Sequence, residues 1–292
     1  MTFFLQLVVS GLAIGCVYAL IALGFVIVFK ATRVLNFAQG DMMMFGAFMT
    51  YLLTNTYHWP FSAALVMTLI GAFLFGFVVE RLILRNMLGQ PVFSVIIVTI
   101  GLAWFIRGIS GMIFGHAEAR ILFPFSGDSV TTPFVDVRLS AENIATLLVT
   151  AVTFAAFFVF LRHSRWGVAM RATASNQDVA QMMGINVNRI AAIAWGLAGV
   201  VGTLAGVILG MLGFLFIGVG DVALRAFPAA VLGGLDATGG AIVGGVILGV
   251  AETIFGGYLG GAYRELMAWI TLIVVLIFRP FGLFGTKDIE RV

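Results

Sequence analysis

Long apolar stretches, separated by short polar connections, set the main limit on how this chain of 292 residues can fold. A helix needs about 20 apolar residues to cross the hydrocarbon core of a bilayer, and it satisfies its own backbone hydrogen bonds there. Charged residues make up only 10% of the sequence, whereas soluble domains contain about 25%. We therefore expect an all-α polytopic membrane protein. Its apolar stretches are residues 4–29, 42–53, 61–79, 92–114, 144–161, 190–212, 222–235, 241–255 and 266–278.

Two of these stretches, 42–53 and 222–235, are too short to cross a bilayer in the ordinary way. Each is either a tilted span that its flanking residues extend or a re-entrant half-helix. We therefore expect about eight or nine transmembrane or re-entrant helices in a single transmembrane domain that covers residues 1–292. The first stretch has no basic region before it and is longer than the core of a signal peptide, so we expect an uncleaved first span.

Basic residues gather in four connections, and this pattern predicts the orientation of the chain in the membrane. Cytoplasmic loops of membrane proteins carry an excess of Lys and Arg. Alternate crossings place the four basic connections on one side, so we expect that side to be cytoplasmic and the N-terminus to lie outside. The loop 115–143 then faces outward. The basic residues concerned are Lys30, Arg33, Arg81, Arg85, Arg162, Arg165, Arg171, Arg189, Arg279, Lys287 and Arg291.

The longest polar interruption, residues 162–190, contains the signals of a short helix outside the bilayer. Ser175 is followed three residues later by Asp178, a spacing typical of a capping box at a helix start. Gly184 stands where a C-terminal cap glycine belongs. The predicted helix has about two turns and one apolar face. That face consists of Val179, Met182 and Met183.

Two interpretations of this short helix are possible. It could lie on the lipid surface, but its apolar face is small for stable binding to lipid. Methionine is an adaptable side chain that suits a groove on another protein. We therefore expect the segment 162–190 to dock on a cytoplasmic partner.

Ionisable side chains inside the apolar stretches are costly there and mark functional candidates. Arg107 lies within 92–114 and Glu252 within 241–255, so each is a candidate for a transport pathway, a subunit contact or a buried pair. Asp41, Glu80 and Asp221 lie at the expected ends of segments, where we expect them to be solvated.

The polar segment 36–41, with the sequence NFAQGD, separates two apolar stretches. It is either a cytoplasmic turn or the broken start of a helix beside the transport pathway. Irregular backbone is tolerated at membrane depth where it lines a cavity. The spacing alone does not choose between the two.

Several classes of function are excluded by the composition. The single Cys16 cannot form an intramolecular disulfide, and the three histidines are too far apart in sequence to suggest a metal site. Neither lysine follows a glycine, so the chain has no phosphate-binding loop with which to hydrolyse ATP. The GxGxxA string at 218–223 lies between stretches apolar enough for a membrane, so it is not a dinucleotide site. The net charge of +3 does not suggest nucleic acid as a partner.

Pairs of glycines four residues apart are frequent in the apolar stretches. Such pairs let two helices approach closely in lipid, so we expect them to mediate internal helix packing. The pairs are Gly11/Gly15, Gly202/Gly206/Gly210, Gly240/Gly244, Gly245/Gly249 and Gly257/Gly261.

Four motifs together resemble a known family. They are NFAQGD at 36–41, GVAMRA at 167–172 with Asn176 and Gly184-Ile185 after it, VLGG at 231–234 with GGA at 239–241, and RPFGLFG at 279–285. In this order the chain resembles, along nearly its whole length, the permease subunits of ATP-binding-cassette importers of the branched-chain amino acid class. It is similar to the shorter of the two paired permeases.

The resemblance implies the ABC importer permease fold and a complex in a bacterial inner membrane. Its other members would be a second homologous permease, two cytoplasmic ATP-binding subunits and a periplasmic substrate-binding protein. This chain would then be a multi-pass transport subunit surrounded by lipid, not an enzyme, with no catalytic residue, metal or cofactor of its own. The partner subunits would use the ATP.

The resemblance also implies which residues carry the coupling, whereas the candidates for transport come from the buried charges and the polar segment 36–41. The cytoplasmic loop 162–190 would couple to the ATPases. The residues proposed for this contact either match the family motif or lie on the apolar face of the predicted helix. These residues are Arg171, Ala172, Asn176, Val179, Ala180, Met182, Met183 and Gly184. The candidate translocation path consists of Asn36, Gln39, Asp41, Arg107 and Glu252.

Branched-chain amino acids are the substrates that the resemblance favours. Gln39 departs from the histidine that the family often has, and Asp236-Ala237-Thr238 replaces a turn that is commonly like Gly-Ser-Ile-Pro. Related permeases for urea, short amides or small organic acids therefore remain alternatives. Outside the family, the alternative is a stand-alone secondary transporter.

Overall fold

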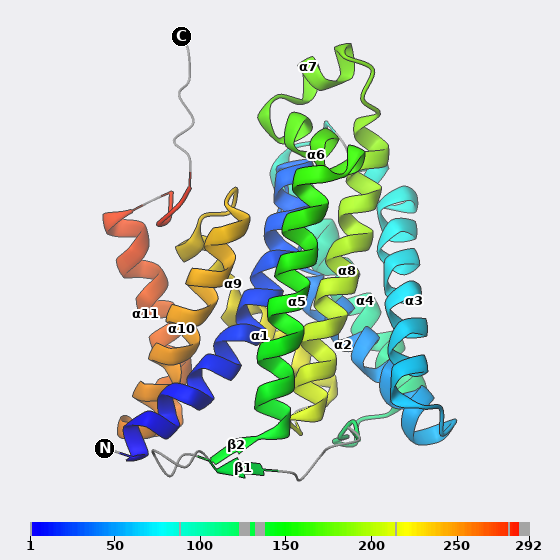
Figure 1. Cartoon of the computed structure of the whole chain (residues 1–292). Helices are drawn as coiled ribbons and strands as arrows, with labels where there is room; N and C mark the ends of the chain where they lie inside the picture. Colours follow the sequence, from blue (N-terminus) through cyan, green and yellow to red (C-terminus); the bar gives the residue numbers. More distant parts are fainter. Residues whose placement is uncertain are drawn as a thin grey trace.

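The computed structural model describes residues 2–87, 89–122, 129–131, 138–213, 215–279 and 281–285, and these are almost entirely helical (Figure 1). The fold also contains three short helical turns, which are η1 (Leu52–Thr56), η2 (Leu84–Met87) and η3 (Ile217–Asp221). Two antiparallel strands of three residues complete it, β1 (Ser129–Thr131) and β2 (Arg138–Ser140). The helices are α1 (Thr2–Thr32), α2 (Gln39–Tyr51), α3 (Phe61–Leu82), α4 (Val92–Phe114), α5 (Ala141–His163), α6 (Arg165–Ser175), α7 (Gln177–Met182), α8 (Val187–Met211), α9 (Val222–Gly233), α10 (Thr238–Leu259) and α11 (Ala262–Phe278).

Each of the nine predicted apolar stretches forms a helix. Within the described residues, six of these helices, α1, α3, α4, α5, α8 and α10, are long and apolar enough to cross a membrane. The helices α2, α9 and α11 have 13, 12 and 17 residues and fall short of that length. The multi-pass character is therefore confirmed, whereas the predicted count of eight or nine spans or re-entrant helices is not.

The core of the molecule is built around α1 and α8. About four fifths of the most apolar window of each is buried, 83% for α1 and 78% for α8, against 22–33% for the other four long helices. The apolar positions of α1 and α8 face protein on nearly all sides, as expected for helices that are hydrophobic all round. The outer helices α3, α4, α5 and α10 present much of their apolar surface outward, as expected in lipid.

Glycines permit the closest helix contacts, as the sequence predicted. A Cβ atom on Gly11 would lie 2.8 Å from the backbone of Val250 in α10, and one on Gly15 would lie 2.9 Å from Val246. Gly202 and Gly206 of α8 and the first pair of α10 likewise face neighbouring helices, whereas Gly210 faces Ile121 of the loop after α4. Gly261 is an exception, because a Cβ atom added to it would meet nothing within 4 Å. Internal packing is thus the role of most of these pairs.

Two parts of the chain share one order of long and short helices, and their helices run through the bundle in opposite directions. Helices α1 to α4 comprise one long helix, one short helix and two further long ones, and α8 to α11 repeat the long–short start. In Figure 1, α1 runs from the lower end of the bundle to the upper end, whereas α8 runs downward. The packing is repeated too, because α1 contacts α10 as α8 contacts α3, and α2 contacts α4 as α9 contacts α11. Such inverted repeats are common in transporters and place a site where their short helices meet.

The basic connections lie at one end of the bundle. The end of α1, the end of α3, the start of α4 and α7 together line one cavity there, and α6 and α7 form the upper end of Figure 1. The strands β1 and β2 lie at the opposite end, with the described parts of loop 115–143. Residues 123–128 and 132–137 of that loop, and Lys287 and Arg291 of the tail, lie outside the described residues.

Candidate functional site

The segment before α2 is buried irregular backbone. Asn36 and Gln39 are both 0% exposed. Asn36 accepts a hydrogen bond from the backbone N–H of Ala38 at 3.0 Å through Oδ1, and its Nδ2 donates to Oε1 of Gln39 at 3.3 Å. Nε2 of Gln39 donates to the carbonyl of Ala198 in α8 at 3.0 Å. Asn36 thus supplies a backbone partner that the unwound segment lacks inside a membrane, and Gln39 ties the segment to α8. The structure therefore favours the broken helix start over the cytoplasmic turn.

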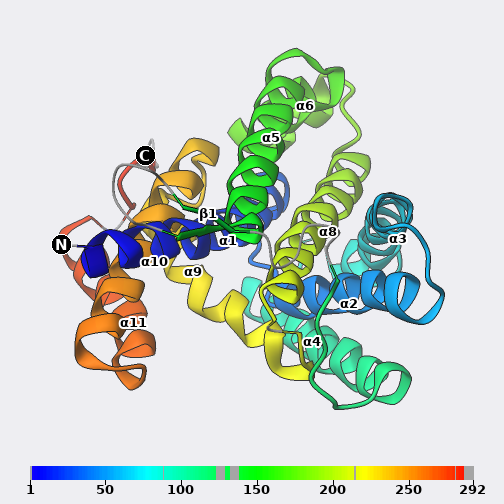
Figure 2. The same ribbon diagram turned by 60° about the horizontal axis from the view of Figure 1, so that its bottom comes forward.

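The start of α2 lies well inside the bundle. The backbone N–H of Phe37 donates to Oγ1 of Thr99 at 3.3 Å. Thr99 is seven residues into α4, which places it roughly 10 Å along that helix. The chain thus leaves α1 at the basic end, runs inward without helical hydrogen bonds, and begins α2 at depth. Figure 2 shows α2 beside α4, with the start of α9 next to them.

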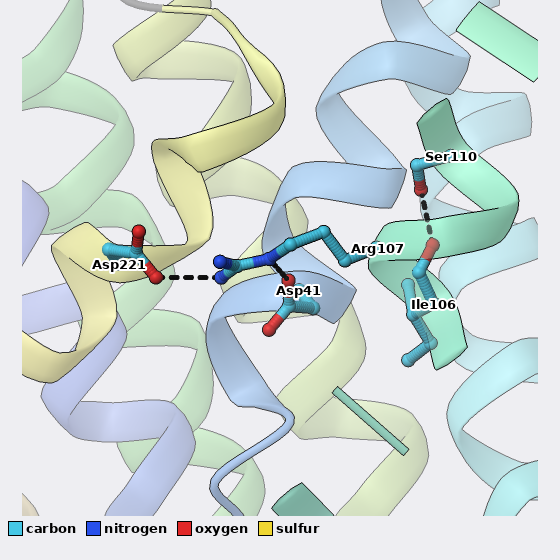
Figure 3. A network of polar contacts seen from close by, with 5 residues as sticks. All are labelled: Asp41, Ile106, Arg107, Ser110 and Asp221. Carbon is cyan, nitrogen blue, oxygen red and sulfur yellow. Dashed lines mark hydrogen bonds and ion pairs between the residues drawn. The ribbon is translucent and has the colours of Figure 1, made fainter. Parts of the chain in front are cut away.

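An ion triad joins α2, α4 and η3 near the start of α2 (Figure 3). Nε of Arg107 donates to Oδ1 of Asp41 at 2.8 Å, and Nη2 donates to Oδ1 of Asp221 at 2.7 Å. The guanidinium also lies 5.1 Å from the centroid of the Trp104 ring, a distance at which a cation–π contact contributes. A planar guanidinium can bridge two carboxylates because its N–H groups form a fixed fork.

The three charges of the triad differ in burial. The side chain of Asp41 is 5% exposed, that of Arg107 is 20% exposed and that of Asp221 is 52% exposed. The expectation that Asp41 is solvated at a segment end is therefore wrong, because the half-helix starts at depth. Asp221 is half exposed, but it is ion-paired as well. Its pairing with Arg107, which lies 114 residues earlier in the chain, was not foreseen.

The two interrupted helices meet backbone to backbone. A Cβ atom on Gly40 would collide with the carbonyl oxygen of Gly220, and one on Gly220 would lie 3.0 Å from Oδ1 of Asp41. Each glycine is followed directly by an aspartate of the triad. The repeated Gly-Asp step, at the start of both short apolar stretches, is a sequence signal that could have pointed to this contact.

A cavity of about 230 Å³ opens beside the triad. Asp41, Arg107 and Asp221 contribute its polar wall. The remaining wall is largely apolar and comes from the segment before α2, from α4 and from the start of α9. It includes Phe37, Ile100, Trp104 and Leu224.

Glu252 belongs to a separate cluster. It is 2% exposed and lies on α10, where Oε1 is 3.7 Å from Nε of Arg264 in α11. Tyr18 of α1 lies against it. A second pair on the same side joins Arg225 of α9 to Glu265 at 3.5 Å. The five residues predicted for the path therefore do not form one site.

Glu80 is buried, contrary to the expectation that a charged residue at a segment end is solvated. It is 1% exposed, and its Oε2 lies 3.4 Å from Nη2 of Arg85. The carboxylate stays buried because η2 folds back and brings Arg85 to it. Glu80 and the end of α1 line a cavity of about 160 Å³ under α7.

The predicted helix in segment 162–190 exists, but its N-terminal cap is one residue later than expected. Ser175 is the last residue of α6. The cap of α7 is Asn176, whose Oδ1 accepts from the backbone N–H of Val179 at 3.0 Å. The C-terminal signal is confirmed, since Gly184 has φ +83° just past the end of the helix. Asparagine and serine are both good N-terminal caps, and here Asn176, the residue after α6, caps α7.

The apolar face of α7 points away from the bundle. Met182 is 85% exposed, Met183 is 78% exposed and Val179 is 53% exposed. Ala180 is only 3% exposed and packs inward, so any part it has in coupling would be to hold the helix in place. The other residues predicted for coupling are exposed or half-buried. They are Arg171, Ala172, Asn176 and Gly184.

Two hydrogen bonds tie this loop to the end of α1. Nη2 of Arg33 donates to the carbonyl of Ala174 at 2.7 Å, and Nε2 of Gln177 donates to the carbonyl of Ala31 at 3.4 Å. Arg33 itself has φ 58°, a conformation uncommon for residues other than glycine. The loop is therefore fixed to the point where the chain turns inward toward Asn36. Within the described part of the chain, no group of three or more His, Cys, Asp or Glu side chains could hold a metal ion.

Comparisons with known proteins address the family and the fold of the chain. Residues 7–276 match the model of a family described as the branched-chain amino acid transport system permease component. The chain is 30% identical to the high-affinity branched-chain amino acid transport system permease protein LivH of Salmonella typhimurium, over 99% of this chain and 98% of that protein. It is 32% identical to BraD of Pseudomonas aeruginosa, a permease protein of the same description, over the same shares. Among solved structures, PsaBC from Streptococcus pneumoniae in complex with Fab has a similar fold, with a TM-score of 0.52, 13% identity and coverage of 97% of this chain and 94% of that one.

Proposed function

Because the chain belongs to the family of branched-chain amino acid transport system permease components, we propose that it is the transmembrane subunit of an ATP-driven importer for branched-chain amino acids. The family covers residues 7–276. In this proposal the chain provides one half of the transmembrane pathway. Separate subunits bind and hydrolyse ATP.

The observation that carries the coupling part of the proposal is the exposed apolar face of α7. Met182 and Met183 project from the basic end of the bundle, and no residue in the described part of this chain covers their side chains. Such a face stabilises a complex by burial in a partner groove, at about 25 cal/mol for each Å² of apolar surface. We place the ATP-binding subunits there, and this end in the cytoplasm.

The anchor between the loop and α1 offers a route for coupling. Arg33 and Gln177 connect the α6–α7 loop to the turn that precedes Asn36. A movement of α7 that follows ATP binding would pull on this turn and so on the start of α2. A partner can drive such a change only if it binds the two states of the permease with different affinity.

The remaining parts of the complex follow from the same proposal. A second homologous permease, two ATP-binding subunits and a periplasmic substrate-binding protein complete the importer in a bacterial inner membrane. The nine predicted segments cross or re-enter the membrane, with the N-terminus outside. Asp41 and Arg107 line the path, Asn36 and Gln39 hold the broken helix beside it, and Glu252 lies on the far side of α1.

The test is a copurification of the permease with its ATP-binding subunits after coexpression of the whole importer. We expect Met182→Ser combined with Met183→Ser to reduce the recovered ATPase by about tenfold, because the apolar face is lost. Met112→Ser is the matched control, since Met112 is 81% exposed near the end of α4 that lies opposite the basic connections. Normal ATPase recovery with the double variant would contradict the docking role. Leucine uptake that persists without any ATP-binding subunit would contradict the importer itself.

A further inference from the structure

The cavity beside Arg107 presents two ionic groups of opposite sign, each with unused hydrogen-bonding capacity. A guanidinium has five N–H donors, and in the described part of the chain Arg107 uses Nε and Nη2 on the two aspartates. Asp221 accepts from Arg107 through Oδ1, and its side chain is 52% exposed. The cavity wall therefore has a carboxylate oxygen and a guanidinium edge available to a ligand.

We propose that this cavity binds the zwitterionic head group of an apolar amino acid, with Asp221 receiving the ammonium and Arg107 the carboxylate. The inference rests on the proposed importer function and specifies where that importer recognises its substrate. Asp221 is then a specificity residue. Asp41, which is 5% exposed, positions the guanidinium.

The charge of the triad supports a ligand that carries an ammonium group. Asp41 and Asp221 contribute two negative charges and Arg107 one positive charge, so the triad has one negative charge in excess. Arg107 lies seven residues before the end of α4, roughly 10 Å from that end of the helix. An uncompensated charge at such a depth is costly. The ammonium of an amino acid compensates it, and the substrate carboxylate is held by the free edge of the guanidinium.

The rest of the cavity wall fits an aliphatic side chain. Ile100, Trp104 and Leu224 line it and are 42%, 66% and 41% exposed. A volume of about 230 Å³ is below the roughly 300–1,000 Å³ of pockets for drug-sized ligands, so the cavity suits a small solute. Urea and short amides carry no ionised groups for the two charges, and simple organic acids lack the ammonium.

The open side of the cavity indicates what completes it. The exposed apolar residues of its wall continue onto the face of α4, where Phe105 is 64% exposed. In the proposed importer a second permease packs against this chain. That subunit would close the cavity around the substrate side chain.

The first experiment measures leucine uptake by the complete importer in proteoliposomes, relative to its rate of ATP hydrolysis. We expect Asp221→Asn to lower uptake by at least about tenfold, because a hydrogen bond to a charged group is lost. Asp221→Glu keeps the charge and should recover part of the uptake. Uptake by Asp221→Asn within about twofold of the unaltered importer would overturn the proposal.

The second experiment tests occupancy of the cavity directly and does not depend on transport. Leu224→Cys is placed in a Cys16→Ser background, so that this chain of the complete importer carries one cysteine, in the cavity. We expect a water-soluble methanethiosulfonate to modify it and leucine to slow the modification by at least about threefold. Leu148→Cys is the control, since Leu148 is 61% exposed on α5 and lies, like Arg107, seven residues from the outer end of its helix.

The ligand specificity of this protection separates the outcomes. 4-Methylpentanoate, which has the leucine skeleton without the ammonium, should not protect Leu224→Cys. Equal protection by the two compounds, or none by leucine, would overturn the zwitterion site. An unaltered importer that takes up no leucine, or that lacks its ATPases, would instead count against the proposed function.

Discussion

Gly40 and Gly220 touch through their backbones, and each is followed by an aspartate that binds the same arginine. This contact holds the starts of two interrupted helices together at the depth of Arg107. It is one of the contacts between the two inverted halves of the chain. The closeness of the contact makes it the first target for testing the arrangement.

Gly40→Ala should destabilise the protein. Its methyl group would collide with the Gly220 carbonyl, and forced overpacking of this kind costs about 1–3 kcal/mol. We expect a lower midpoint of thermal unfolding for the purified protein in detergent. Gly71→Ala is the control, because a Cβ atom on Gly71 of α3 would meet nothing within 4 Å. Equal midpoints for the two variants would show that the helices do not meet in this way.

Arg107→Lys should impair transport although it keeps the positive charge. An ammonium group cannot reproduce the fork that bonds Asp41 and Asp221 at 2.8 and 2.7 Å. Losing one charged hydrogen bond of roughly 1.5–3 kcal/mol should reduce leucine uptake by about tenfold or more. Arg81→Lys, at an exposed position of α3, serves as the control in the same uptake assay. Full activity of Arg107→Lys would show that the bridge is dispensable.

Arg33→Gln combined with Gln177→Ala should uncouple ATP hydrolysis from uptake. Both hydrogen bonds from the loop to the end of α1 are removed, while the apolar face of α7 remains. We expect the ATPases to copurify normally but the number of leucine molecules taken up for each ATP to fall several-fold. Arg165→Gln, at an exposed position in the same loop, should leave that ratio unchanged. A ratio unaffected by the double variant would assign the coupling to other contacts.

Asn176→Ala should weaken ATPase binding, whereas Ser175→Ala should not. Asn176 caps α7 at 3.0 Å, and loss of an N-terminal cap costs about 1 kcal/mol. For a six-residue helix this is enough to unfold the free segment, so the ATPase should bind several-fold more weakly. The measurement is the equilibrium affinity of the purified permease for its ATP-binding subunit. Equal effects of the two variants would contradict a capping role specific to Asn176.

The apolar pattern predicted where the helices lie, because membrane length and hydrophobicity depend on local sequence. The predicted stretch 92–114 coincides with α4, and both short stretches became short helices. The depth of α2 does not follow from the apolar pattern, since it depends on the Gln39 amide that bonds to α8. The cap of α7 was misplaced by one residue because two neighbouring side chains both suit the role.

The spacing of charged residues along the sequence does not predict which of them pair in the candidate site. Arg107 and Asp41 lie 66 residues apart, and Arg107 and Asp221 lie 114 apart. Whether such charges meet depends on the rotation and depth of three helices, which hydrophobicity does not specify. The predicted path residues therefore divide between the start of α2 with its triad and the separate Glu252 cluster. The recurrence of Gly-Asp was the one local sign that the two short stretches belong together.

The six residues of α7 are too few to form a stable helix in isolation. The shape of α7 therefore depends on its anchors to Ala31 and on the packing of Ala180. A permease whose first helix has not inserted would lack the Ala31 anchor and would present no formed α7. On the proposed docking, the ATPases would then assemble only on chains that have already folded, so the same contact would serve as a checkpoint of biogenesis as well as a link in transport.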